Sequence, residues 1–178
     1  VINNAGILRD ASFAKMTNED WDLIYRVHAL GAYKVTKAAW PIMQEQGYGR
    51  IVNTASAAGL LNQVGDAAYS TTKHAAVGFA EALAITHGDD GIKVSCLCPQ
   101  AVSTRMIGGI EDGGTAGVDG IITPEQVAAT VVQGLAEEKF LLLPHPEVEQ
   151  YRERKTADYD RWLGGMRKLR RSFDNPIL

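Results

Sequence analysis

Residues 50–99 read RIVNTASAAGLLNQVGDAAYSTTKHAAVGFAEALAITHGDDGIKVSCLCP, and two kinds of pattern alternate along them. A short apolar run (50–55) comes first, a long alanine-rich segment (68–87) follows, and a second apolar run (93–98) ends at Pro99. Short apolar runs bounded by turn residues predict strands, and the longer segment predicts a helix. Strands that alternate with helices are typical of a parallel sheet, so the stretch predicts an α/β fold.

The rest of the chain continues this alternation. Thr17 is a good N-cap because two acidic residues follow it in the first turn of a helical pattern. Thr123 begins a capping box with proline at the first helical position. The elements predicted here are the end of a strand at 1–2, helices at 18–46 and 123–139, and a last strand at 140–143. Residues 1–178 are expected to form a single domain.

Composition excludes several classes of protein. The 178 residues are 46% hydrophobic and 22% charged with a net charge of −3, values that fit a soluble globular chain and exclude disorder. No apolar run approaches the roughly 20 residues of a membrane span, so no membrane partner is expected. Cys96 and Cys98 lie two apart on a predicted strand, too close for an ordinary disulfide and too few for a metal such as zinc. A reducing, cytoplasmic location is therefore expected.

Charge is distributed unevenly along the chain. Residues 151–178 contain eight basic and four acidic residues, a net +4, which leaves −7 for residues 1–150. A nucleic-acid-binding protein would be basic over its body, so no nucleic-acid partner is expected. The basic segment either meets an anionic ligand or forms a solvated helix face.

Residues 108–120, GGIEDGGTAGVDG, contain six glycines among thirteen residues, a density that disfavours a helix. The segment follows the exit turn of the strand at 93–98, and ligands of open α/β sheets bind beyond the carboxyl ends of the strands. We expect a flexible loop that closes over a substrate; an insertion without a role is the alternative.

Polar residues follow three of the predicted strands. Asn3-Asn4-Ala5-Gly6 comes at the end of the first strand, Ser56 follows the second, and residues 99–104 follow the third. All of them should therefore meet at one edge of the sheet. Tyr69 and Lys73 are four apart and share a helix face. An ammonium beside a phenol lowers the phenol pKa from about 10, which permits proton exchange near neutral pH. The alternative is an ordinary exposed Tyr/Lys pair.

These residues together resemble the short-chain dehydrogenase/reductase family. Residues 3–6 reproduce its NNAG turn and residues 69–73 its YxxxK motif, while Ser56 has the spacing of the family's serine, with twelve residues before Tyr69. Residues 99–104, PQAVST, resemble its PGxxxT segment, although Gln100 replaces the glycine. YxxxK alone is weak, but four motifs in order at the predicted element boundaries are specific.

The resemblance implies a Rossmann-like doubly wound parallel sheet and a hydride transfer between NAD or NADP and a secondary alcohol or ketone. Tyr69 would be the general acid/base, Ser56 would orient the substrate oxygen, and Lys73 would assist the tyrosine and bond the nicotinamide ribose. The long helices at 18–46 and 68–87 would pair with a second copy to give a dimer or tetramer. The residues that would line the cofactor are Asn4, Ala5, Gly6, Tyr69, Lys73, Pro99, Val102 and Thr104.

Two departures from the family pattern matter. His28 stands where the family's proton relay has an asparagine, so it is either a relay residue or a packed histidine. Its RVH context and the NNAGILRD segment resemble (3R)-hydroxyacyl-CoA dehydrogenase portions of multifunctional β-oxidation enzymes, which favours a lipophilic or acyl-type substrate. An apolar pocket wall is expected from Leu60, Leu61, Val64, Met106, Ile107 and Ile110.

The second departure is the absence of three strands and a glycine-rich TGxxxGxG turn before residue 3. We therefore expect the C-terminal portion of the fold, about four strands with flanking helices, which alone neither binds the dinucleotide tightly nor turns over substrate. The residue that separates NAD from NADP is absent too. Three functions remain open: a dehydrogenase, an inactive interaction protein of the same fold, and a non-redox enzyme such as an epimerase or dehydratase.

Overall fold

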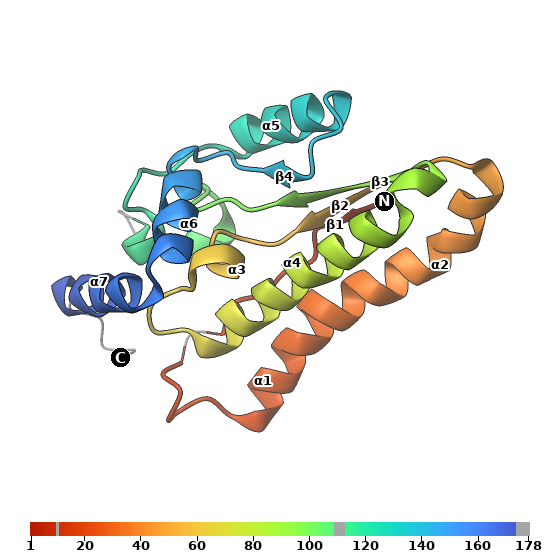
Figure 1. Cartoon of the computed structure of the whole chain (residues 1–178). Coiled ribbons are helices and arrows are strands. Elements are labelled where there is room, and N and C mark those ends of the chain that lie inside the picture. The colour runs from red at the N-terminus through yellow and green to blue at the C-terminus, as the bar shows by residue number, and fades with distance from the viewer. Residues whose placement is uncertain (10, 109–112, 174–178) are drawn as a thin grey trace.

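The computed structural model describes residues 1–9, 11–108 and 113–173. Among these residues, strands run in one parallel sheet in the order β1-β2-β3-β4, with helices on both faces (Figure 1). This confirms the predicted α/β fold with four strands and flanking helices. The strands are β1 (Ile2–Asn3), β2 (Gly49–Thr54), β3 (Ile92–Leu97) and β4 (Leu141–Leu142).

The helices form two covering layers and a third group beyond the strand ends. Helices α2 and α4 lie side by side on one face, α5 covers the other, and α3, α6 and α7 lie beyond the carboxyl ends of the strands (Figure 1). No helix within the described ranges is long and apolar enough to cross a membrane. The helices are α1 (Asn18–Tyr25), η1 (Arg26–Leu30), α2 (Gly31–Gln46), α3 (Ala58–Leu61), α4 (Ala67–His87), η2 (Gly88–Asp90), η3 (Arg105–Ile107), η4 (Gly114–Ala116), α5 (Pro124–Ala136), α6 (Glu147–Ala157) and α7 (Tyr159–Ser172).

The sheet is buried on both faces because its strands are apolar at successive positions. Ile51 packs in the cluster that α2 and α4 contribute to, and its neighbour Val52 packs in the cluster formed with α5. Successive strand residues point to opposite faces, so each strand fills two cores at once. Deep burial on both sides gives the sheet the rigidity to hold loops at its carboxyl edge.

The helix predicted over 18–46 is interrupted. Between α1 and α2 lies one π-helical turn, η1, which the hydrophobic pattern did not predict. Ile24, His28, Ala32 and Thr36 are all buried, one every four residues. In a regular α-helix each four-residue step overshoots a full turn by about 40°. A π-helical turn rotates less per residue, which offsets most of this excess rotation and keeps the four side chains on one face of the helix.

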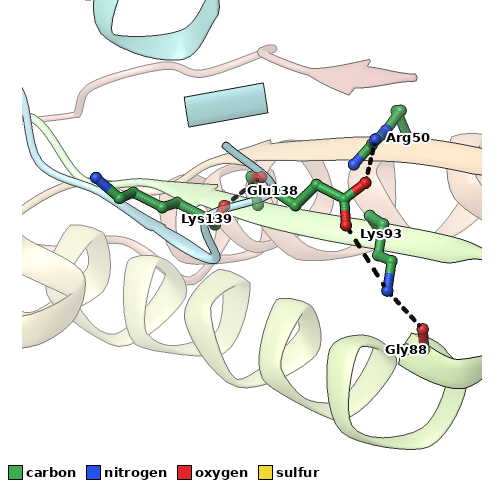
Figure 2. A network of polar contacts seen from close by, with 6 residues as sticks. Arg50, Gly88, Lys93, Glu138 and Lys139 are labelled. Atoms are coloured by element: carbon green, nitrogen blue, oxygen red, sulfur yellow. Dashed lines mark hydrogen bonds and ion pairs between the residues drawn. The ribbon is translucent and has the colours of Figure 1, made fainter. Parts of the chain in front are cut away.

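At the amino-terminal edge of the sheet, the Glu138 carboxylate forms ion pairs with two basic side chains (Figure 2). Arg50 and Lys93 begin adjacent strands in register, and Glu138 lies 2.6 Å from the Arg50 guanidinium and 3.9 Å from the Lys93 ammonium. Glu138 has a φ of 53°, the conformation that glycine usually supplies after a helix. The two ion pairs explain why a glutamate, not a glycine, occupies this strained position after α5.

Part of the glycine-rich segment is hydrogen-bonded to the exit of β3. Residues 113–120 contain the short helix η4, and the Ala101 N–H donates to the Ala116 carbonyl at 3.0 Å. Residues 109–112 lie outside the described residues. That residues 108–120 form a flexible loop over a substrate stays a prediction.

Candidate active site

The ends of the strands are aligned, which brings the predicted polar residues to one edge. Asn3 pairs with Asn53 in register, and Thr54 pairs with Leu97. Ser56 follows directly on β2, where its hydroxyl lies 3.4 Å from the Pro99 carbonyl and accepts the Ala58 N–H at 3.1 Å. The serine hydroxyl is thus held at the carboxyl edge, half-buried, between the exits of β2 and β3.

Tyr69 and Lys73 lie in the first turns of α4. Asp66 caps this helix and accepts the Tyr69 N–H at 2.8 Å. The Lys73 side chain is only 4% exposed, and its ammonium donates to the Thr54 carbonyl at 3.0 Å and lies 5.5 Å from the centre of the Tyr69 ring. Burial lowers the pKa of Lys73 to about 8, so the ammonium is still mainly charged at neutral pH. A positive charge is therefore held beside the phenol ring.

A second Tyr/Lys pair in the chain shows what distinguishes this one. Tyr33 and Lys37 have the same spacing on α2, and the Lys37 ammonium donates to the Tyr33 hydroxyl at 3.0 Å. Both are exposed, and this hydrogen bond raises the pKa of Lys37, whereas burial lowers that of Lys73. The same motif therefore gives a surface contact on one helix and a buried cation on the other.

His28 is buried on η1 and both of its ring nitrogens have partners. Nε2 accepts the Ile7 N–H at 3.1 Å, so Nδ1 carries the proton and donates to the Thr72 hydroxyl at 2.8 Å. Burial, together with the nearby charge of Lys73, lowers the pKa of His28 to about 4. The neutral ring links the loop after β1 to α4.

Helix α3, which begins two residues after Ser56, packs closely against α4. A Cβ atom at Gly59 of α3 would lie 2.6 Å from the Lys73 carbonyl oxygen and 3.0 Å from a methyl of Val77. Only glycine permits this approach without a shift of the backbone. No sequence pattern marked Gly59 as part of the site.

The segment after β1 approaches Lys73 at Gly6. A Cβ atom at Gly6 would lie 3.7 Å from the His28 Nε2 and 3.9 Å from the Lys73 Nζ, so the Gly6 backbone lies close to the ammonium. Asn4 and Ala5 are exposed next to it. Gly6 and Lys73, two of the predicted cofactor residues, are therefore neighbours at the strand edge.

The remaining predicted cofactor residues lie on the segment after β3. Pro99 and Val102 are half-buried, and Val102 forms an isolated parallel bridge with Ile122. Thr104 is exposed and caps η3, where it accepts the Met106 N–H at 3.3 Å. Their contact with a cofactor stays a prediction, as do the roles of the catalytic residues.

A cavity of about 660 Å³ reaches Ser56. Of the six residues expected to form its apolar wall, Leu61 lines it; Ile110 lies outside the described residues. Much of the wall instead comes from α6 and α7, among them Tyr151, Trp162 and Met166. The apolar spacing of Trp162, Met166 and Leu169 on one helix face was the signal that could have identified them.

Comparison with known proteins places this geometry in a family. A family model described as short chain dehydrogenase matches residues 1–113. Peroxisomal multifunctional enzyme A of Dictyostelium discoideum is 52% identical over 103 residues, which are 58% of this chain and 23% of that protein. An acetoacetyl-CoA reductase of Shinella zoogloeoides is 38% identical over 112 residues, which are 63% of this chain and 46% of that protein.

A solved structure shows the same arrangement over most of the chain. A short chain dehydrogenase/reductase from Burkholderia phymatum, in complex with NAD, has a TM-score of 0.77 and 26% identity, covering 89% of this chain and 65% of that one. The chain spans less than half the length of each of the two curated relatives above. The family match, the parallel sheet and the Ser/Tyr/Lys edge agree: the chain belongs to the short-chain dehydrogenase family.

Proposed function

We propose that the protein is an NAD- or NADP-dependent oxidoreductase that interconverts a secondary alcohol and a ketone on a lipophilic or acyl-type small molecule. The observation that carries this proposal is the buried ammonium of Lys73 beside the ring of Tyr69, at the strand edge that also holds Ser56. The relatives named for acetoacetyl-CoA reduction and the NAD complex of a solved neighbour support it.

Each residue of this edge has a proposed task. Tyr69 donates a proton to the substrate oxygen during reduction or removes it during oxidation. The Lys73 ammonium stabilises the negative charge that forms on the tyrosine oxygen, and its remaining donors bind a ribose hydroxyl. The Ser56 hydroxyl orients the substrate oxygen towards Tyr69. The nicotinamide, when bound, supplies the hydride chemistry.

The cofactor residues are proposed in the same way. Asn4, Ala5 and Gly6 would lie on the ribose side, and the closeness of Gly6 to the Lys73 ammonium supports their role. The segment from Pro99 through Val102 to Thr104 would flank the nicotinamide. The turn that would hold the pyrophosphate is not among the 178 residues, so cofactor binding and turnover are best measured in the full-length protein.

For His28 the contacts favour a positioning role. A relay group must exchange a proton, but both ring nitrogens already have partners and the ring is neutral well below pH 7. We propose that His28 holds the loop at Ile7 against Thr72 of α4. That contact fixes the distance between the residues after β1 and the Tyr69/Lys73 turns.

The test is Tyr69→Phe, with Tyr33→Phe as the matched control. Tyr69→Phe removes only the proton-transfer hydroxyl, so turnover should fall by about 10²–10⁴-fold while nicotinamide binding is retained. Tyr33→Phe removes a hydroxyl from the exposed pair and should leave turnover unchanged. Activity of Tyr69→Phe within tenfold of the unmodified protein would refute the assignment. Substrate conversion without net change in nicotinamide absorbance would indicate non-redox chemistry instead.

We also propose a homo-oligomer in which α2 and α4 pair with a second copy. Val35 and Ile42 of α2 are exposed, and α4 presents small exposed residues at Ala75, Gly78 and Ala82 on one face. Light scattering at micromolar concentration should give a dimer or tetramer of the full-length protein; a monomer alone would refute this.

A cytoplasmic location is proposed because Cys96 and Cys98 are free thiols, although both are buried. Fluorescence microscopy of a tagged full-length protein would test it. Import into an organelle would refute the proposal.

A further inference from the structure

The peptide group between Pro99 and Gln100 connects the exits of β2 and β3. Its carbonyl oxygen accepts the Ala57 N–H at 2.8 Å and lies 3.4 Å from the Ser56 hydroxyl oxygen. An O–H···O contact of this length is weak, so the hydroxyl proton remains available to a substrate oxygen. The same serine oxygen accepts the Ala58 N–H at 3.1 Å. The Pro99 carbonyl therefore fixes both the backbone beside Ser56 and the direction of its hydroxyl.

The other end of this peptide group is held by His145, which follows the end of β4. The Gln100 N–H donates to the His145 Nδ1 at 3.2 Å. The peptide bond is trans and planar, so its N–H and its carbonyl point in opposite directions and turn together. The group that fixes the N–H also fixes the carbonyl. One rigid unit thus carries the position of His145 to Ser56.

His145 accepts this hydrogen bond because its ring is neutral. The side chain is only 3% exposed, and burial lowers the pKa of His145. The groups that act in the opposite direction are weaker: the backbone carbonyls of Gly120 and Ala101 and the charges of Glu147 and Asp119. A neutral imidazole has one acceptor nitrogen, and here it is Nδ1 because the partner is an N–H.

The side chain of Gln100 holds the same residue at a second point. Its amide donates to one oxygen of Asp119 at 2.9 Å, and the other oxygen of Asp119 accepts the Tyr151 hydroxyl at 2.8 Å. Tyr151 lies on α6, where the neighbouring turn carries the fully buried Val148. Glycine, which the family pattern has at position 100, would lack this contact. Gln100 is therefore held by the exit of β4 and by α6 together.

We propose that His145 is a positioning residue: it holds the peptide group after Pro99, and this peptide group sets the place and direction of the Ser56 hydroxyl. The inference rests on the proposed oxidoreductase function. His145 transfers no proton, because its contact is with the backbone, and it acts on turnover through Ser56 alone. The contacts of Gln100 with Asp119 and of Asp119 with Tyr151 keep the peptide group from shifting along the sheet edge.

Two replacements of similar size separate the acceptor of His145 from the volume of its ring. The Oδ1 of asparagine occupies the place of Nδ1 along the side chain, so His145→Asn keeps an acceptor, whereas His145→Leu has none. Both leave space where the ring was, so that cost is common to the two variants. In the full-length protein, His145→Leu should lower kcat by on the order of tenfold, and His145→Asn should retain most of it. Equal losses of kcat in the two variants would overturn the inference.

A double-mutant cycle with Ser56→Ala separates positioning from a general loss of structure. Since His145 acts through Ser56, His145→Leu should lower kcat no further in a protein that already carries Ser56→Ala. The same fold-loss of kcat with and without the serine hydroxyl would assign His145 to the stability of the fold and overturn the inference.

Hydrogen exchange tests the contact without any turnover. The Gln100 N–H should exchange faster in His145→Leu than in His145→Asn, by on the order of fivefold or more, while the amides of α2 on the far side of the sheet exchange alike in both. Equal exchange of the Gln100 N–H would overturn the inference, whatever reaction the protein catalyses. A difference in exchange without nicotinamide-dependent turnover in the unmodified protein would support the contact and refute the oxidoreductase function alone.

Discussion

Replacing Gly59 by alanine tests whether the approach of α3 to α4 sets the catalytic geometry. The new Cβ would lie 2.6 Å from the Lys73 carbonyl oxygen, about 0.8 Å short of the 3.4 Å at which ordinary contact begins. The nearest atoms are backbone, so no side-chain rotation relieves the clash. The four-residue α3 is the element that moves, and it carries Ser56 away from Tyr69.

This shift has two measurable effects. Overpacking of this kind lowers the free energy of unfolding by about 1–3 kcal/mol, and each kcal/mol lowers Tm by about 2–4 °C in a domain of this size. A displacement close to 1 Å lowers kcat by up to about 10²-fold, because the substrate oxygen no longer lies between the serine and tyrosine hydroxyls. Cofactor affinity should be retained, since Lys73 stays on the longer helix.

Thermal unfolding by circular dichroism and steady-state kinetics below Tm are the assays. Gly88→Ala is the control, because a Cβ atom at Gly88 meets nothing within 4 Å. If Gly59→Ala kept both the Tm and kcat of the unmodified protein, the idea that this contact positions Ser56 would be wrong. A lower Tm with normal kcat would show that the contact serves stability alone.

Two further predictions concern stability. The pKa of His28 is lowered from 6.5 to about 4 in the folded chain, so between these values the unfolded chain binds a proton that the folded chain does not. Stability should therefore fall as pH falls through this window, by about 1.4 kcal/mol per pH unit, and His28→Asn should reduce the slope in urea unfolding; an equal slope would contradict this. Glu138→Gln leaves Arg50 and Lys93 adjacent without their carboxylate and should lower the free energy of unfolding by about 0.5–1 kcal/mol at low salt and less at high salt. Glu138→Gly also loses the ion pairs but relieves the positive φ, worth about 1 kcal/mol, so it should unfold near the urea midpoint of the unmodified protein; a midpoint below that of Glu138→Gln would contradict the strain.

The sequence predicted what depends on local pattern. Strand and helix positions around residues 50–99 were correct to within one or two residues, because apolar runs and proline or glycine boundaries specify them. The convergence of the strand exits at one edge also followed, since parallel strands align their carboxyl ends, while the roles of Ser56, Tyr69 and Lys73 stay predictions. The sequence did not predict that Lys73 is buried. The exposed Tyr33/Lys37 pair has the same spacing, which shows that spacing alone does not predict burial.

Features that depend on contacts between distant segments were missed. The Gly59 contact joins α3 to α4, and nothing in the local pattern marks one glycine among many as a packing site. The sequence predicts a wall from residues 60–64 and 106–110, but α6 and α7 supply much of it from the far end of the chain. Apolar spacing marks one face of α7, but tertiary packing decides which part of the molecule that face meets.

The π-helical turn gives the α1–α2 helix one place where its length can change. Because η1 holds more residues than an α-helical turn, loss of one residue between 26 and 30 would leave a continuous α-helix. Thr36 would then follow Ile24 by about eleven residues, and at about 100° each these end within about 20° of three full turns. Thr36 would therefore still face Asn3, whose amide donates to its hydroxyl at 2.9 Å and so ties α2 to the start of the sheet. A deletion between 31 and 35, within regular α-helix, would instead turn Thr36 away by about 100°. Natural variants that differ in the length of this helix should therefore differ at η1.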